Sequence, residues 1–279
     1  MKDAISKGTI YALLLLGAVL MLFPFLWMLS TSLMTPREII AMNPRVWVPS
    51  SLQWGNYPRA MAIAPFDRFF LNSILVTVIG TIGELLTTVL AAYAFSKMEF
   101  RGRDFLFALL IGTMMVPSEV LLIPNFVTMS NIPVLGVNLI DTIHAIYIPW
   151  LASVFSIFLV RQFFMTVPKQ LSYAAKVDGC SEFRFLWHVM VPLAKPALIT
   201  MALLSVINSW NAFTWPMLVT FTASTRTLPV GLAMFRNEAG TFFELIMAAS
   251  VITVLPMVIL FVILQKYVVE GVAKSGIKG

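Results

Sequence analysis

Six stretches of this chain are each long and apolar enough to cross a lipid bilayer, and this feature constrains the fold most. A spanning helix needs about 20 mostly apolar residues. The six candidates are Thr9–Leu33, Leu71–Ser96, Phe105–Phe126, Ile143–Val160, Ala197–Phe221 and Leu245–Leu264. The sequence therefore predicts an all-α, polytopic membrane bundle of six transmembrane helices.

The composition excludes several classes of function. The chain is 59% hydrophobic and only 11% charged, whereas a soluble domain is about one quarter charged. A single cysteine, Cys180, excludes an internal disulfide and Cys-rich metal sites. The two histidines, His144 and His188, lie far apart in the sequence. No Gly-rich loop precedes a Lys-Ser/Thr pair, so a P-loop is absent. We expect no catalytic residue, metal or cofactor here, and any ATP and Mg must be bound by another chain.

Lysine and arginine indicate the orientation, because cytoplasmic loops of membrane proteins are rich in both. With the N-terminus in the cytoplasm, every lysine falls on the inner side. The inner set is Lys2, Lys7, Lys97, Arg101, Arg103, Arg161, Lys169, Lys176, Arg184, Lys195, Lys266, Lys274 and Lys278. We expect a multi-pass protein of the cell membrane with both termini in the cytoplasm. The net charge of +6 then reflects topology and not binding of nucleic acid.

The spans and loops predict three parts of the chain. Residues 1–70 hold the first helix and a long outer loop, residues 71–265 form the core with an inner loop at 161–195, and residues 266–279 are an inner tail. The outer loop carries Trp47, Trp54 and Tyr57. These aromatic residues are either interface anchors or a docking surface.

The inner loop has the pattern of two short helices joined by a tight turn. Pro168 precedes the helical run KQLSYAAKV, and this run ends at Asp178-Gly179, where glycine can supply a left-handed cap. The small side chains of Ala174 and Ala175 would let another surface approach the first helix closely. From the pattern alone, this helix either contacts a partner or packs on its own bundle.

The second half of the inner loop predicts an amphipathic helix. Ser181 can cap it, and Glu182 in the first turn suits the helix dipole. Pro192 is expected to end it. Large apolar residues recur at helical spacing and predict a face that lies in the membrane interface. They are Phe183, Leu186, Trp187 and Met190.

This inner loop resembles the cytoplasmic loop of binding-protein-dependent ABC importers. The family pattern is Glu-Ala-Ala, three residues, Gly, nine residues, Ile, one residue and Leu-Pro. The matching positions are Tyr173, Ala174, Ala175, Gly179, Val189, Val191 and Pro192. The spacing fits throughout, and the main departure is Tyr173 in place of Glu.

The resemblance implies a coupling helix that docks in a groove of an ATPase subunit. Tyr173 cannot form the ion pair expected of the family's Glu, and Asp178 is a nearby acid that could partly replace it. The resemblance further implies two ATPase subunits, a second permease that is usually a different chain, and an extracellular or periplasmic solute-binding protein. Transport would proceed by alternating access.

Three further stretches resemble the carbohydrate branch of these permeases, of the maltose and glycerol-3-phosphate type. They are AAYAFSKMEFRGRD, MMVPSEVLLIP and NSWNAFTWPMLV. The resemblance covers about residues 70–270 and implies the permease fold of type I ABC importers, with a sugar or sugar-like solute.

Two acids inside predicted spans need a reason, because a charge at the bilayer centre is costly. Glu119 lies between Pro117 and Pro124 and either lines the path or bonds between helices. For Glu84 we favour a structural role, because Gly80 and Gly83 indicate a tight packing face beside it. Another polar cluster either contacts the solute or holds helices together. Its members are Asn208, Trp210, Asn211 and Trp215.

Two other classes of function remain as alternatives. An ion-gradient-driven secondary transporter would use acids near the midplane and inverted repeats; Glu84 and Glu119 give it slight support, whereas no repeat is detectable. An intramembrane enzyme would need a catalytic pair, and two histidines and one cysteine build no obvious one.

Overall fold

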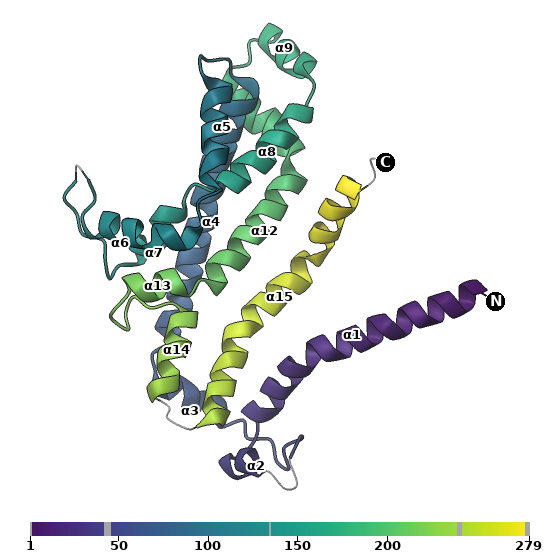
Figure 1. Cartoon of the computed structure of the whole chain (residues 1–279), viewed down its shortest axis with the longest axis vertical. Coiled ribbons are helices and arrows are strands. Elements are labelled where there is room, and N and C mark those ends of the chain that lie inside the picture. Colours follow the sequence, from purple (N-terminus) through teal and green to yellow (C-terminus); the bar gives the residue numbers. More distant parts are fainter. Residues whose placement is uncertain (1, 42–45, 134, 239–241, 277–279) are drawn as a thin grey trace. The chain divides into compact units, whose positions relative to one another are not determined.

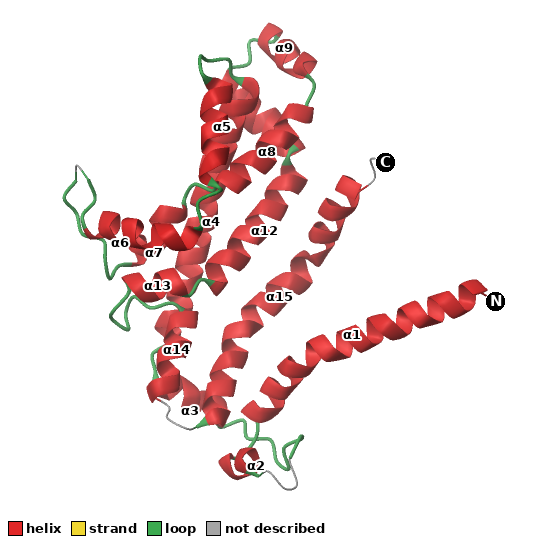
Figure 2. Cartoon of the chain, viewed as in Figure 1, coloured by secondary structure: helices red, strands yellow, loops and turns green. Residues whose placement is uncertain are grey.

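The computed structural model describes residues 2–41, 46–133, 135–238 and 242–276. The described residues form helices joined by loops, with no β-strand among them and an isolated bridge between Ile132 and Val137 (Figures 1 and 2). The predicted all-α class is confirmed. Continuous helices include the first, second and sixth predicted spans. They are α1 (Lys2–Ser32), α4 (Phe66–Lys97) and α15 (Phe243–Gly276).

The third, fourth and fifth predicted spans overlap three bent helix pairs, a feature that the predicted stretches did not specify. The pairs are Arg103–Thr113 with Ser118–Ser130, bent by 93°; Ile143–Trp150 with Val154–Thr166, bent by 43°; and Glu182–Leu193 with Lys195–Asn211, bent by 80°. Their elements are α5 (Arg103–Thr113), η1 (Ser118–Leu121), α6 (Leu122–Ser130), α7 (Ile143–Tyr147), η2 (Ile148–Trp150), α8 (Val154–Thr166), α10 (Glu182–Phe185), η3 (Leu186–Met190), α11 (Val191–Leu193) and α12 (Lys195–Asn211). With each bent pair taken as one span, the described residues hold up to six spans.

Local chemistry explains where these helices break. Pro117 has ψ 136° and starts η1, and proline disfavours helix in the residue before it. Ser153 is extended, and its side chain accepts the N–H of Ser156 to cap α8. The predicted fifth span ends early, at Asn211, and the chain resumes as α13 (Thr214–Val219) after an extended Ala212.

The chain packs as two compact units. Unit 1 comprises residues 1–67 and 230–258, and unit 2 comprises residues 68–229 and 259–279. The predicted division at residues 70 and 265 stays a prediction, because compactness does not show which part works as the permease core. Part of the predicted tail, up to Gly276, continues helix α15.

In unit 1, the described part of the predicted outer loop contains α2 (Pro36–Ile40) and α3 (Asn56–Ile63). Thr35 and Glu38 form a capping box at α2. Hydrogen bonds from the Ser50 hydroxyl, and from Thr35 and the Ser50 N–H, lower the pKa of Glu38 to about 2. The Asn56 amide donates to the carbonyls of Ser32 and Met34, both at 3.0 Å. These bonds fix the chain that follows α1.

In unit 2, side chains of α4 satisfy backbone carbonyls of the loops that follow broken helices. The Thr87 hydroxyl donates to the carbonyl of Leu151, in the break before α8. The Lys97 ammonium donates to the carbonyl of Val167 at 2.7 Å, just after α8. A carbonyl freed from a helix needs such a partner inside a membrane protein. α4 is therefore the continuous helix on which the broken ones are organised.

The predicted packing face on α4 is confirmed. A Cβ added at Gly83 would lie 2.4 Å from Leu151 Cδ2, and one at Gly80 would lie 3.5 Å from Tyr147 Cβ. Beside them, Glu84 accepts hydrogen bonds from Ser156 Oγ of α8 at 2.7 Å and from Ser205 Oγ of α12 at 2.5 Å. Glu84 thus joins three helices, which supports its structural interpretation.

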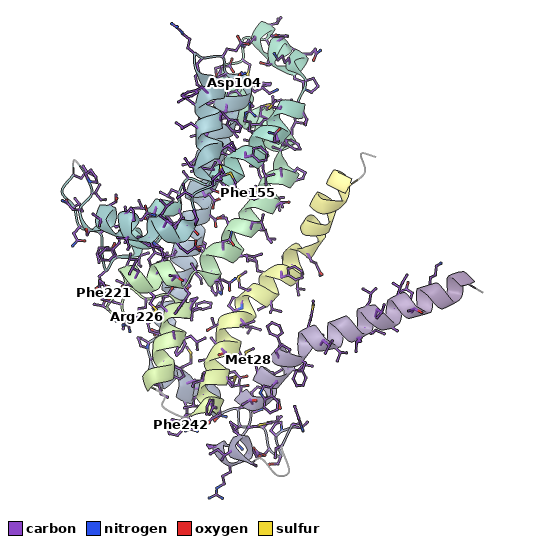
Figure 3. The ribbon with its side chains drawn as sticks, viewed as in Figure 1. Met28, Asp104, Phe155, Phe221, Arg226 and Phe242 are labelled. Carbon is purple, nitrogen blue, oxygen red and sulfur yellow. The ribbon has the colours of Figure 1, made fainter. Side chains whose placement is uncertain are left out.

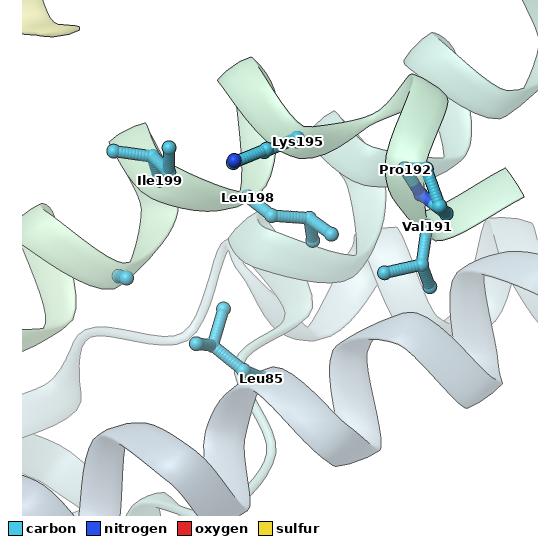
Figure 4. Close-up of a pocket in the computed structure, with 7 residues that line it drawn as sticks. Leu85, Val191, Pro192, Lys195, Leu198 and Ile199 are labelled. Atoms are coloured by element: carbon cyan, nitrogen blue, oxygen red, sulfur yellow. The ribbon is translucent and has the colours of Figure 1, made fainter. Parts of the chain in front are cut away.

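An open groove of about 480 Å³ runs between α4 and the α11–α12 corner (Figure 4). Apart from Lys195, its walls are apolar. The lining residues are Leu85, Val191, Pro192, Lys195, Leu198, Ile199 and Ala202. The packing of unit 2 thus leaves an apolar surface on these helices.

We expect Glu84→Ala to lower the melting temperature of the purified protein in detergent. The substitution removes two interhelical hydrogen bonds, which are worth about 0.6 kcal/mol each in membrane proteins. Glu119→Ala is the matched control, because Glu119 is exposed and bonds only its neighbour Ser118 among the described residues. Equal melting temperatures for the two variants would contradict a structural role for Glu84.

Candidate functional site

The candidate residues lie in two regions of unit 2. One is the loop around α9 (Lys169–Val177), at the end where Asp104 lies. The other surrounds α13, near Phe221 and Arg226 (Figure 3). The structure thus separates the predicted docking loop from the predicted solute path.

The predicted turn after α9 is present. Gly179 has φ +70°, in the left-handed region that glycine adopts without steric cost. Its N–H donates to the carbonyl of Lys176 at 3.1 Å, and the N–H of Cys180 donates to the carbonyl of Ala175 at 2.8 Å. These two bonds are a Schellman motif, which satisfies the last carbonyls of the helix. The motif gives α9 a defined end and direction.

One face of α9 is open to solvent. Tyr173 is 62% exposed and Val177 is 88% exposed, and Ala174 is also exposed. Ala175 instead packs inward against the buried core of unit 2. The two alanines therefore have different surroundings. Asp178 is exposed and forms the C-cap of α9.

The helix after the turn starts as predicted but packs differently. Ser181 caps it by accepting the N–H of Arg184 at 3.3 Å. Leu186 and Met190 are 2% and 0% exposed and belong to the protein core, whereas Phe183 is 67% exposed. The prediction that they share a membrane-facing surface was therefore wrong.

A π-helical turn lies within this amphipathic segment. Residues Leu186–Met190 are π-helical, and the wider turn changes which side chains share a face. Pro192, which has no N–H to donate, lies just beyond it. The helix runs to Leu193 and not to Pro192.

A polar network that the sequence reasoning missed ties this loop to α4. The Tyr93 hydroxyl donates a hydrogen bond to Glu182 Oε2, and Lys176 Nζ lies 3.0 Å from Glu182 Oε1. The hydrogen bond and the charge of Glu182 raise the pKa of Lys176. The only sequence signal for Tyr93 was its position in the stretch AAYAFS.

The cluster on α12 and α13 divides into buried rings and exposed amides. Trp210 and Trp215 are 6% and 5% exposed, and Trp215 Nε1 donates to the carbonyl of Ala145 at 3.0 Å. Asn208 and Asn211 are exposed on α12. The tryptophans therefore pack the bundle, whereas the two amides face away from it.

Glu119 lies on η1 and is exposed. Its bond among the described residues is from the hydroxyl of adjacent Ser118, at 3.2 Å. It does not bond another helix within that part of the chain. The described residues also contain no group of three His, Cys, Asp or Glu side chains that could hold a metal ion.

Asp141 holds the loop that follows α13. Its Oδ1 accepts the N–H groups of Phe221 and Thr222 at 2.8 and 3.0 Å, and the Thr225 hydroxyl at 2.6 Å. Burial favours the protonated acid, but these bonds outweigh it and lower the pKa of Asp141 from 3.8 to about 2. Asn72 of α4 fixes the same loop by donating to the carbonyl of Ser224 at 2.8 Å.

Residues 84–274 match the family described as the binding-protein-dependent transport system inner membrane component. The chain belongs to this family. The family predicted from the inner loop is thus confirmed, and the chain is a membrane-spanning permease.

Named relatives cover nearly the whole chain. It is 32% identical over 264 residues to the arabinooligosaccharides transport system permease protein AraQ of Halalkalibacterium halodurans, covering 94% of this chain and 93% of the relative. It is 34% identical over 260 residues to the sulfoquinovosyl glycerol transport system permease protein SmoH of Agrobacterium fabrum, covering 92% and 89%. These relatives are carbohydrate-type permeases by name.

Two solved structures have the same fold. A chain of a bacterial ABC transporter involved in the import of the acidic polysaccharide alginate superposes with a TM-score of 0.83 at 28% identity, covering 96% of this chain and 98% of that chain. A chain of an alginate ABC transporter in complex with an alginate pentasaccharide-bound periplasmic protein superposes with a TM-score of 0.68 at 13% identity, which shows the fold alone. The predicted ABC importer permease fold is confirmed.

We expect Asp141→Ala to speed hydrogen exchange of the Phe221 and Thr222 amides, because it removes their acceptor. Asp104→Ala is the control, since exposed Asp104 pairs only with adjacent Arg103 among the described residues. Unchanged exchange in the Asp141 variant would contradict the assigned role.

The same bonds predict how protection of this loop depends on pH. The pKa of Asp141 is about 2 in the folded protein and near 3.8 in the unfolded chain. Its contribution to stability is therefore complete above pH 3.8 and is lost as the pH falls through about 2. We therefore expect opening free energies for these two amides that stay constant between about pH 5 and pH 8. A loss of protection within that window would contradict the lowered pKa.

Proposed function

We propose that this chain is one permease of an ATP-driven importer for a sugar or sugar-like solute, and that α9 is its coupling helix. The observation that carries the proposal is the geometry of α9: a short helix with a defined end and one face open to solvent. The exposed Tyr173 and Ala174 form the contact surface, and Gly179 fixes its direction. Two ATPase subunits bind ATP and Mg and receive α9.

The names of relatives favour a carbohydrate solute and the other subunits of the complex. They include permeases for arabinooligosaccharides and for sulfoquinovosyl glycerol. An alginate transporter of the same fold is described in complex with a periplasmic protein that carries an oligosaccharide. We infer that a solute-binding protein delivers the solute to this chain and a second permease, which in this family is usually a different protein.

The distribution of basic residues supports a cytoplasmic position for α9 and for both termini. In unit 2, α4 ends at Lys97, α5 begins at Arg103 and α12 begins at Lys195. The loop itself carries Lys169 and Lys176. Basic residues are concentrated on the cytoplasmic side of membrane proteins. Binding of ATP would then close the ATPase subunits beneath α9 and drive alternating access.

Exposure supports different roles for the predicted path residues. Asn208, Asn211 and Glu119 are exposed on this chain and are proposed to face the solute path. Amide and carboxylate groups can hydrogen-bond the hydroxyl groups of a sugar. Trp210 and Trp215 are buried, which favours a supporting role for both. Glu84, which accepts two serine hydroxyls, is a poor candidate for the coupling-ion site of a secondary transporter.

The proposal is tested by purifying the tagged chain from native membranes in mild detergent and identifying the co-purifying proteins by mass spectrometry. We expect an ATPase, a second permease and a solute-binding protein. Purification of the chain alone, under conditions that preserve other complexes, would exclude the importer.

We expect Gly179→Ala to reduce the amount of co-purifying ATPase several-fold. An alanine in the left-handed region costs roughly 1–2 kcal/mol, which here would redirect the end of α9. Gly102→Ala is a matched control, because Gly102 has φ +81° and an added Cβ meets nothing within 4 Å at either glycine. Equal ATPase retention in both variants would contradict docking through α9.

A further inference from the structure

Tyr93 gives α4 a directional contact with the coupling loop. Its side chain is 4% exposed, and its hydroxyl donates to Glu182 Oε2. Glu182 is the first residue of α10, directly after the turn that ends α9. A hydrogen bond to an ionised carboxylate is stronger than one between neutral groups. The bond therefore fixes the position of this turn relative to α4.

The Glu182 carboxylate also joins the two sides of the turn. Its Oε1 pairs with Lys176 of α9 at 3.0 Å, while Oε2 accepts the Tyr93 hydroxyl. The pair with Lys176 is exposed, with 61% and 48% of the two side chains accessible, so it adds little stability. The bond to Tyr93 is partly buried because the Tyr93 side chain is buried, and it is the stronger of the two contacts.

The ring of Tyr93 is held firmly in place. It packs edge-on against Phe164 of α8, with centroids 6.5 Å apart and planes at 83°, and Phe164 is 0% exposed. The position of the hydroxyl is therefore fixed by two helices of unit 2, α4 and α8. Movement of Glu182 would act on α4 through that hydroxyl.

Other contacts at this end of unit 2 do not replace this bond. Arg161 Nε donates to the carbonyl of Phe95 at 3.1 Å and the Lys97 ammonium to Val167 at 2.7 Å; both join α4 to the α8 segment. The segment from α9 to α10 covers residues 169–185. Among the described residues, the bond from Tyr93 to Glu182 is the one side-chain hydrogen bond that joins this segment to α4. Ala175 and Phe185 also pack in the core cluster that contains Val89 and Ala92 of α4, but the hydrophobic effect is non-directional, so the hydrogen bond adds a fixed direction to this packing.

We propose that Tyr93 and Glu182 are a positioning pair that transmits displacement of α9 to α4 during transport. The inference rests on the proposed function, because it requires α9 to be moved by an ATPase. Tyr93 is buried and would act only through the position of Glu182. It determines how much of the movement of α9 reaches the spans, and hence how much solute is carried for each ATP hydrolysed.

The test compares wild type and Tyr93→Phe in the complete complex, reconstituted in proteoliposomes with the solute-binding protein. Phenylalanine keeps the ring on Phe164 and removes only the hydroxyl. We expect the ratio of solute transported to ATP hydrolysed to fall roughly tenfold, a size typical for losing a hydrogen bond to a charged group. ATPase retention and basal hydrolysis should stay at wild-type levels.

Four further variants separate positioning from general damage. Glu182→Gln keeps an oxygen acceptor for Tyr93, so its ratio of solute transported to ATP hydrolysed should stay close to that of wild type. Glu182→Ala has no acceptor, so its ratio should fall as in Tyr93→Phe. Tyr147→Phe is the matched control, because its hydroxyl contacts His144 of the same helix, α7. The double variant Tyr93→Phe/Glu182→Ala should be no worse than either single variant, since both remove the same bond.

The outcomes also distinguish this inference from the proposed function. If the wild-type chain retains no ATPase, the proposed function fails. If wild type transports and Tyr93→Phe keeps the wild-type ratio, only the positioning pair is overturned. If Tyr93→Phe loses the ATPase altogether, the bond serves assembly and the positioning role is overturned as well.

Discussion

The fold depends on the requirement that backbone groups within a bilayer be paired inside the protein. Unbroken helices meet this requirement alone, whereas each broken span frees N–H and C=O groups. In unit 2 the continuous helix α4 supplies many of the partners. Three of its side chains donate to loop carbonyls: Asn72 to Ser224, Thr87 to Leu151 and Lys97 to Val167. These three polar residues of α4 therefore lie where neighbouring chain segments leave helical geometry, whereas Glu84 joins helices through their side chains.

The sequence predicted the number and composition of the spans better than their continuity. Hydropathy and length identify a stretch that can cross the bilayer, but they average over the residues at which a helix breaks. Pro117 was visible in the third span, yet a proline can kink a helix as well as end it. The 93° bend depends on the packing of the two halves, which no single window of sequence contains.

The loop around α9 was predictable where its structure is local. Pro168, Gly179 and Ser181 act on their immediate neighbours, and each has the predicted role in the structure. The contact between Tyr93 and Glu182 joins residues that are 89 positions apart, so no local pattern could indicate it. The same limit applies to the tryptophans and asparagines near α12, because burial depends on which helices pack beside them.

In the complex proposed above, the position of the acids in the loop affects how α9 would bind an ATPase subunit. The family pattern has a Glu where this chain has the neutral Tyr173, while Asp178 forms the helix C-cap and Glu182 is engaged by Tyr93 and Lys176. The outward face instead presents Tyr173 and Val177, which are 62% and 88% exposed. Apolar and aromatic contacts depend on shape and buried area, and they are less sensitive to salt than ion pairs. If α9 docks as proposed, placement of its backbone by the Gly179 turn therefore matters more than it would for a helix held by a long-range charge.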